Sequence, residues 1–164
     1  MSEISRVNLF GKLTPLAYKA VEGATVFCKL RGNPYVELVH WLNQILQNAD
    51  SDVHRIVKHF SLDASRLAAD FTLSLESLPR GHSSISDLSE HIENTIERSW
   101  VYGTLQFGES AVRSGHLIYG ALKTPSLRNV VLAISKEFGK IKLEEFGEKF
   151  ASIVGGSPED SQGP

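Results

Sequence analysis

Apolar residues recur every three or four positions through most of this chain, the pattern of helices that bury one face. The clearest example begins at Thr14-Pro15, where a capping residue precedes a proline at the first helical position, and ends at Arg31-Gly32. Alternating runs of β-branched residues bounded by hairpin turns are almost absent. The pattern therefore predicts an all-α fold, with helices at 14–31, 35–48, 52–60, 63–77, 87–105, 109–122, 126–138 and 142–153.

The predicted helices fall into two similar groups on either side of a polar linker at 79–86. Val36–His40 aligns with Val112–His116, and a period of about 75 residues is longer than that of the common solenoids. The sequence thus predicts two fused four-helix repeats, about 13–78 and 87–154, with a pseudo-twofold relation. Further pairs are Leu13-Thr14 with Leu88-Ser89, Ala17 with Ile92, Val21 with Ile96, Ala24 with Ser99, Leu46 with Leu122, Phe60 with Phe138, and Phe71 with Phe150.

The two ends of the chain lie outside these repeats. Residues 1–12 form an N-terminal extension to the predicted domain of residues 13–154. Residues 155–164 contain no apolar side chain that could offset the entropy of ordering, so we expect a disordered linker that folding does not need. A chain that ends within a linker is typical of a fragment of something longer.

Composition narrows the class of protein. The 164 residues are 41% apolar and 22% charged, with a formal net charge of -2, so neither a disordered chain nor a nucleic-acid partner is expected. No targeting segment and no run of about 18 apolar residues occurs, which predicts a cytoplasmic protein without a membrane partner. The lone Cys28 lies in an apolar helical register and is expected in the core.

The motifs that could carry chemistry are weak. The stretch Gly115–Thr124 has the glycine spacing of a phosphate loop, but Ala121 and Leu122 separate the second glycine from the lysine. His54 and His59 are five positions apart, which places them on different helix faces. His40 and His116 occupy equivalent repeat positions and are expected to share a packing or hydrogen-bonding role. We therefore predict no catalytic residue, no metal site, no cofactor and no nucleotide binding in this chain.

The repeat contains motifs of a known family. The pattern L-T-x-x-A-x-x-A-V-E-x-A at 13–24 and V-E-x-x-H at 36–40 resembles the Clp N-terminal domain, which heads Hsp100 unfoldases and disaggregases. The stretches Val21–Cys28, Val39–Leu42 and Gly115–Arg128 are similar to the ClpV branch, the AAA+ ATPases of type VI secretion. The resemblance covers residues 10–153.

The resemblance implies a recognition domain rather than an enzyme. Such a domain captures the N-terminal helix of a sheath subunit and delivers it for sheath disassembly. ATP and Mg are expected for the full-length parent, a hexamer, whereas the fragment is expected to be monomeric. The alternatives are a general unfolded-client or adaptor-binding N-domain of a disaggregase and, in a different class, a small helical enzyme.

The helix at 14–31 has more apolar surface than one interface requires. Leu16, Gly23 and Phe27 extend its core face, whereas their repeat counterparts are His91, Arg98 and Tyr102. This flank either makes a wider intramolecular contact, for example with the segment 4–10, or takes an amphipathic partner helix. The second interpretation predicts a partner site at Leu13, Thr14, Leu16, Ala20, Gly23 and Phe27; disaggregase relatives imply an alternative groove at Thr14, Ile92 and Leu117.

Overall fold

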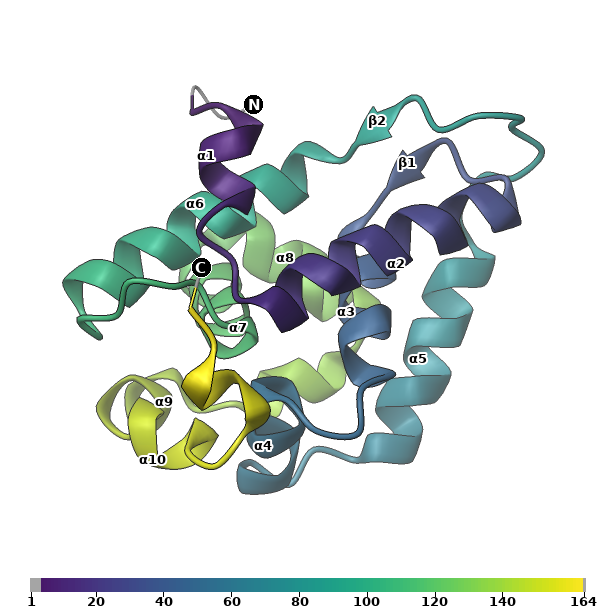
Figure 1. The fold of residues 1–164 in the computed structure, drawn as a ribbon. Helices are drawn as coiled ribbons and strands as arrows, with labels where there is room; N and C mark the ends of the chain where they lie inside the picture. Colours follow the sequence, from purple (N-terminus) through teal and green to yellow (C-terminus); the bar gives the residue numbers. More distant parts are fainter. Residues whose placement is uncertain (1–3, 164) are drawn as a thin grey trace.

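The computed structural model describes residues 4–163 and confirms an all-α fold (Figure 1). Two-residue strands β1 (Tyr35–Val36) and β2 (Asp87–Leu88) replace the predicted helical starts at 35 and 87. The helices are α1 (Arg6–Phe10), α2 (Pro15–Arg31), α3 (Leu38–Leu46), α4 (Asp52–His59), α5 (Ala64–Glu76), α6 (Glu90–Leu105), α7 (Ser114–Lys123), α8 (Pro125–Ile134), α9 (Leu143–Glu148) and α10 (Phe150–Val154), with 3-10 turns η1 (Lys136–Lys140) and η2 (Pro158–Ser161).

Local sequence determines the bounds of α2, the longest of these helices. The Thr14 side chain accepts a hydrogen bond from the Ala17 N–H, and Pro15 occupies the first turn, where its missing N–H costs nothing. At the other end Gly32 adopts a left-handed φ of 70°, and its N–H bonds the carbonyls of Cys28 and Lys29. The buried face of α2 packs against α3.

Backbone hydrogen bonds confirm the pseudo-twofold relation between the repeats. The Thr14 N–H donates to the Val112 carbonyl at 3.0 Å, and the equivalent Ser89 N–H donates to the Val36 carbonyl at 2.8 Å. Both contacts belong to short parallel pairings, Leu13 with Val112 and β1 with β2. Each repeat therefore begins its first long helix on the backbone of the other repeat, which joins the two halves into one unit.

The two core histidines have the same local role, as expected from the repeat. The Nδ1 atom of His40 accepts from the Glu37 N–H at 2.8 Å, and the Nδ1 atom of His116 accepts from the Arg113 N–H at 3.1 Å. In each case the ring satisfies a free N–H at the start of its helix, α3 or α7. Both histidines are fully buried.

Aromatic side chains join the two repeats in the core. Phe60 packs edge-on against Phe146, and Phe71 stacks on Phe138, so aromatic contacts link the two repeats twice. Phe71 lies seven positions after the first residue of α5, and Phe150 lies seven positions after the first residue of α9, which agrees with the predicted pair. Phe150 stacks on Phe107, at 4.4 Å between ring centroids. The helix predicted over 142–153 is divided into α9 and α10, and this break lies between Phe146 and Phe150.

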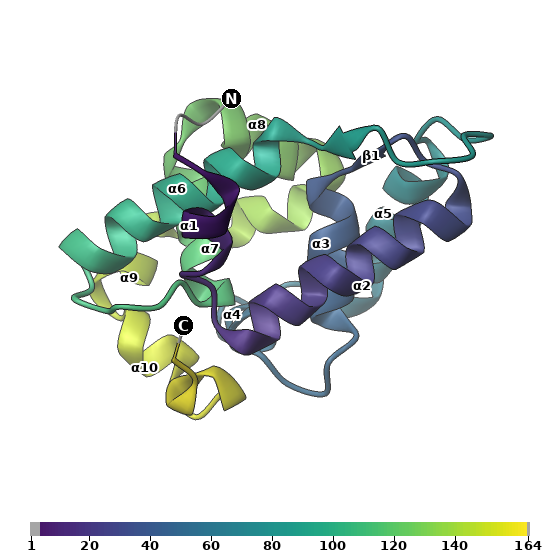
Figure 2. The ribbon, with the colours of Figure 1, turned by 45° about the horizontal axis from the view of Figure 1, so that its top comes forward.

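The C-terminal segment is ordered, so the prediction of a disordered linker at 155–164 was wrong for the described residues. After α10 the chain turns into η2 and runs back to the start of α2 (Figures 1 and 2). Glu159 is only 1% exposed, and Ser157 is also buried. Buried hydrogen bonds rather than apolar burial hold the segment in place, which a search for apolar residues does not detect.

The N-terminal extension contains a short helix that packs on the second repeat. Helix α1 contacts α6, and Arg6 forms ion pairs with Asp87 and Glu93. Ser5 caps the helix by accepting from the Asn8 N–H. The segment 4–10 therefore does not cover the Leu16, Gly23 and Phe27 flank of α2. Figure 2 shows α1 lying beside α6.

Candidate partner-binding grooves

A shallow apolar groove lies between α1 and α2, and we call it the α1–α2 groove. Its volume is about 320 Å³. Tyr18 on its wall is 44% exposed. Only two charged side chains, at the α2 edge, interrupt the apolar lining. The lining residues are Phe10, Gly11, Leu13, Pro15, Tyr18, Lys19 and Glu22.

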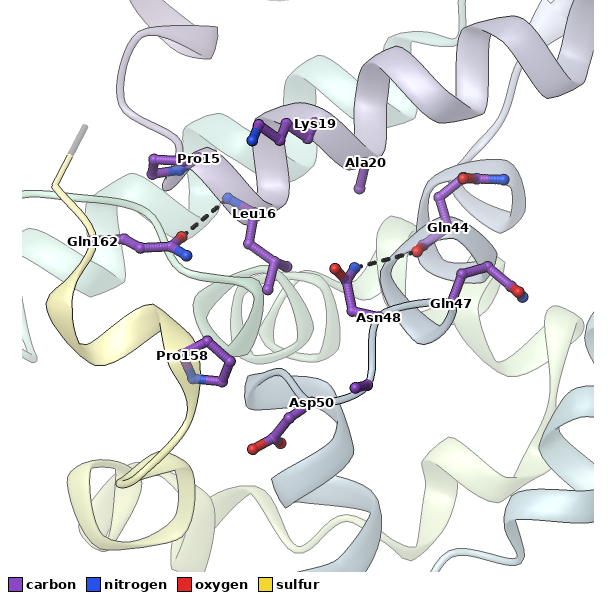
Figure 3. Close-up of a pocket in the computed structure, with 11 residues that line it drawn as sticks. Pro15, Leu16, Lys19, Ala20, Gln44, Gln47, Asn48, Asp50, Pro158 and Gln162 are labelled. Carbon is purple, nitrogen blue, oxygen red and sulfur yellow. Dashed lines mark hydrogen bonds between the residues drawn. The ribbon is translucent and has the colours of Figure 1, made fainter.

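A larger cavity lies on the other side of α2, between α2, the end of α3 and the C-terminal segment (Figure 3). We call it the α2–α3 cavity; its volume is about 520 Å³. Leu16 and Ala20 supply apolar surface on one side, and most of the other lining side chains are polar. The full lining is Pro15, Leu16, Lys19, Ala20, Gln44, Gln47, Asn48, Ala49, Asp50, Pro158 and Gln162.

The two hollows suit different ligands. The apolar face of an amphipathic helix needs a continuous apolar surface with polar groups at its edges. The α1–α2 groove has that arrangement, because Phe10, Leu13 and Tyr18 are bordered by Lys19 and Glu22. The α2–α3 cavity has several amide side chains, which a purely apolar helix face would leave without hydrogen-bond partners. The geometry therefore favours the α1–α2 groove for a partner helix.

The structure separates the six predicted partner-binding residues. Leu13 lines the α1–α2 groove, whereas Leu16 and Ala20 line the α2–α3 cavity. Thr14 is completely buried, and its hydroxyl donates to Glu159 at 2.9 Å. It therefore has no surface for a partner, and that part of the prediction is corrected.

The expected gap at Gly23 is already filled. A Cβ atom added there would lie 2.6 Å from Gln44 Oε1, so the Gln44 side chain occupies this space. Phe27 is partly buried, packs edge-on against His40 and lies under the Arg31 guanidinium. The flank at Gly23 and Phe27 is therefore part of the contact between α2 and α3 rather than an open groove.

The alternative groove implied by the disaggregase relatives is closed in this structure. Ile92 is fully buried and Leu117 is 2% exposed, so both belong to the core with Thr14. Their equivalence to core residues of the first repeat explains this burial. A partner would have to displace the packing of α6 against α7 to reach them.

Sequence reasoning missed two groove residues, Phe10 and Tyr18. The sequence does contain one signal, because Ser5 is a favourable capping residue for a short N-terminal helix. Which side of α2 this helix would border depends on its ion pairs with Asp87 and Glu93. Those residues belong to the second repeat, and no local pattern connects them to Arg6.

A buried polar cluster lies beneath the start of α2. Asp52 accepts two hydrogen bonds from Arg113, at 2.8 and 2.9 Å, and one from Ser157 Oγ at 2.6 Å. Burial, and after it the negative charge of Asp52, raise the pKa of Glu159, and hydrogen bonds from Ser114 oppose that rise. Because protein donors already bond both carboxylates of the cluster, the geometry is that of a structural network.

Two further features of the described residues, 4–163, bear on function. No group of three or more His, Cys, Asp or Glu side chains within this range has the arrangement needed to hold a metal ion. Within the same range, no helix combines the length and the apolar character that crossing a bilayer demands.

The sequence is similar to two curated proteins. It is 62% identical over 160 residues to the AAA+ ATPase ClpV1 of Pseudomonas aeruginosa, and 46% identical over 159 residues to the chaperone protein ClpB of Yersinia enterocolitica. These alignments cover 98% and 97% of this chain but 18% of the length of each relative. No family model matches the chain.

Solved structures agree with these relatives. One, from work on coevolution of the ATPase ClpV, the TssB-TssC sheath and the accessory HsiE protein, matches with a TM-score of 0.94 and 62% identity, over 98% of this chain and 99% of that chain. A ClpV N-domain in complex with a VipB peptide matches with a TM-score of 0.83 and 24% identity, over 97% of each chain.

The double helical repeat and the matches to solved ClpV N-domains define the fold class as a Clp-type N-domain. Within that class, the 62% identity extends over nearly the full length of the matching solved chain. The chain belongs to the ClpV family and corresponds to its N-domain.

Proposed function

We propose that this chain is a substrate-recognition domain that binds an N-terminal helix of a type VI secretion sheath subunit in the α1–α2 groove. The observation that carries the proposal is the apolar groove itself, with Phe10 and Leu13 in its lining and Tyr18 exposed on its wall. A helix with apolar residues at i, i+3, i+4 and i+7 would anchor there. The VipB peptide bound to a ClpV N-domain of the same fold supports this class of partner.

The role of the whole protein follows from that partner. We propose that the parent is a hexameric ATPase using ATP and Mg, and that its N-domain supplies recognition and no chemistry. Delivery of the captured subunit would then direct sheath disassembly in the cytoplasm. The slightly acidic net charge of -2 supports a protein partner rather than nucleic acid.

A second candidate is the binding of general unfolded clients or adaptors, as in a disaggregase. The 46% identity to the chaperone protein ClpB favours keeping this alternative. The two functions differ in selectivity, because a groove for one helix discriminates among peptides whereas a client site does not. Competition by a denatured polypeptide therefore separates them.

The test measures binding of a fluorescent peptide, copied from the N-terminal helix of the sheath subunit, by fluorescence anisotropy. Phe10→Ala and Tyr18→Ala should each weaken binding by about 10-fold or more, since central apolar anchors contribute at least about 1–2 kcal/mol. Val26→Asp is the matched control, because Val26 is also exposed on α2 but lies outside the groove. Unchanged binding by both groove variants would place the site elsewhere, and equal competition by denatured protein would favour the client-binding function.

A further inference from the structure

The segment Ser157–Gln162, which we call the C-terminal segment, is anchored by one buried carboxylate. Glu159 Oε1 accepts from the Thr14 hydroxyl at 2.9 Å and from the Ser114 N–H at 2.7 Å. Its Oε2 accepts from the Asp52 N–H at 3.0 Å and from the Ser114 hydroxyl at 2.5 Å. Four donors therefore converge on a side chain that is 1% exposed.

These donors lie at the N-terminal ends of three helices. Thr14 is the capping residue of α2, and Asp52 and Ser114 are the first residues of α4 and α7. The first N–H groups of a helix have no partner within it, and the helix dipole places partial positive charge there. Glu159 thus joins the beginnings of α2, α4 and α7 through a single contact point.

A second contact reaches the first turn of α2 directly. The Leu16 N–H donates to Gln162 Oε1 at 3.0 Å, and Figure 3 shows Gln162 approaching α2 from the C-terminal segment. The same turn of α2 carries Pro15 and Tyr18, which line the α1–α2 groove on its other side. One turn of helix therefore lies between the C-terminal segment and the groove.

The contacts that hold the C-terminal segment are polar. Polar contacts hold it in place: besides Glu159 and Gln162, Asp160 pairs with Arg113 at 2.6 Å and Arg55 bonds the Gly156 carbonyl at 2.9 Å. No large apolar side chain of this segment is inserted between the helices. A segment held only by such contacts opens locally at a lower free energy than global unfolding.

We propose that docking of the C-terminal segment and occupancy of the α1–α2 groove are thermodynamically coupled, with Glu159 and Gln162 as positioning residues for the groove. The inference rests on the proposed function, because the ligand is the sheath helix. When the segment is docked, the first turn of α2 has its polar groups satisfied and presents Pro15 and Tyr18 in a fixed geometry. When it is released, that turn loses these acceptors and frays, and a helix must order it on binding.

Coupling of this kind is reciprocal. If docking of the segment raises the affinity for the helix by a given factor, helix binding raises the equilibrium constant for docking of the segment by the same factor. The proposal therefore predicts two independent observations, one made at the groove and one made at the segment. A purely structural role for Glu159 would lower thermal stability without linking hydrogen exchange in the segment to peptide binding.

The first experiment measures peptide affinity for Glu159→Ala and Gln162→Ala. Each should bind about 5- to 50-fold more weakly than the parent chain, within the usual range of coupling between sites. The controls are Glu144→Ala on the exposed surface of α9 and Gln47→Ala in the wall of the α2–α3 cavity. If Glu159→Ala fails to fold, the affinity of Gln162→Ala tests the coupling, because this variant loses a single hydrogen bond.

The second experiment follows amide hydrogen exchange in the parent chain with and without the peptide. Saturating peptide should slow exchange in residues 157–162 and at the Leu16 N–H by about 5-fold or more. Unchanged exchange there, or unchanged affinity in folded variants, would overturn the coupling while leaving the groove intact. Absence of peptide binding by the parent chain would instead overturn the proposed function.

Discussion

The carboxylate of Glu159 accepts a hydrogen bond from the hydroxyl of Thr14, which lies 145 positions earlier in the chain, at 2.9 Å. Thr14 begins the helix that borders both hollows, and Glu159 belongs to the segment that the sequence predicted to be disordered. The same carboxylate bonds α4 and α7. This contact makes the C-terminal segment part of the domain and connects it to the candidate site.

Deleting residues 155–164 should destabilise the domain, contrary to the expectation from sequence. The truncation removes the acceptor for the Thr14 and Ser114 hydroxyls and for two helix N–H groups. Water can replace part of this bonding, so we expect a loss of about 2 kcal/mol and a fall in Tm of about 4–8 °C. Differential scanning calorimetry of the full and truncated chains measures this fall in Tm. A Tm of the truncated chain within about 1–2 °C of the parent would contradict the docked arrangement.

Breaking the ion pair between Arg113 and Asp52 should be the most damaging single change in the polar cluster. Their side chains are 9% and 0% exposed, so Arg113→Met leaves a buried carboxylate without its partner. We expect a loss of about 3–5 kcal/mol in the free energy of unfolding by urea denaturation. The control is Arg55→Met, because Arg55 pairs with Asp50 at a site where both side chains are 34% exposed, so water screens the pair and the loss should be much smaller.

Lowering the pH should reduce the free energy of unfolding because of His40. Burial, and after it the charge of Arg31, lower the pKa of His40 from 6.5 to about 4. The unfolded chain therefore takes up a proton below pH 6.5 that the folded chain does not take up until about pH 4. This difference removes about 2 kcal/mol between pH 7.5 and pH 5, and about 3 kcal/mol by pH 4.

The geometry explains why the folded protein excludes that proton. His40 Nδ1 already accepts from the Glu37 N–H, and Nε2 lies 2.9 Å from Asn33 Oδ1, so both nitrogens of the neutral ring have a hydrogen-bond partner. Urea denaturation at pH 7.5 and pH 5 measures the effect. His40→Gln should reduce the change in the free energy of unfolding between these two pH values. If the parent and the variant changed equally, the pH dependence would come from other groups.

Much of the fold could be predicted from the sequence because its determinants are local or repeated. Thr14-Pro15 and Gly32 define the ends of α2 in both the sequence and the structure. The alignment of His40 with His116 correctly indicated a shared hydrogen-bonding role. The short strands were missed because two-residue pairings depend on backbone contacts between repeats and leave no periodic pattern.

The candidate site could be predicted only in part. The excess apolar surface of α2 indicated this helix, and Leu13 lines the groove that we propose as the site. The particular flank was wrong because Gln44 of α3 fills the space at Gly23. Helical periodicity states which residues share a face, but not which neighbouring helix will cover that face.

The sequence alone determined the all-α class, the double repeat and the family, because capping residues, apolar spacing and repeated motifs are encoded within short windows. The tertiary structure decided which side of α2 is open and whether the C-terminal segment is ordered. Arg6 meets Asp87 and Glu93, and Glu159 meets Thr14, only after the chain has folded. Such polar contacts between distant residues depend on distance and burial in three dimensions, and the linear pattern of apolar residues contains neither.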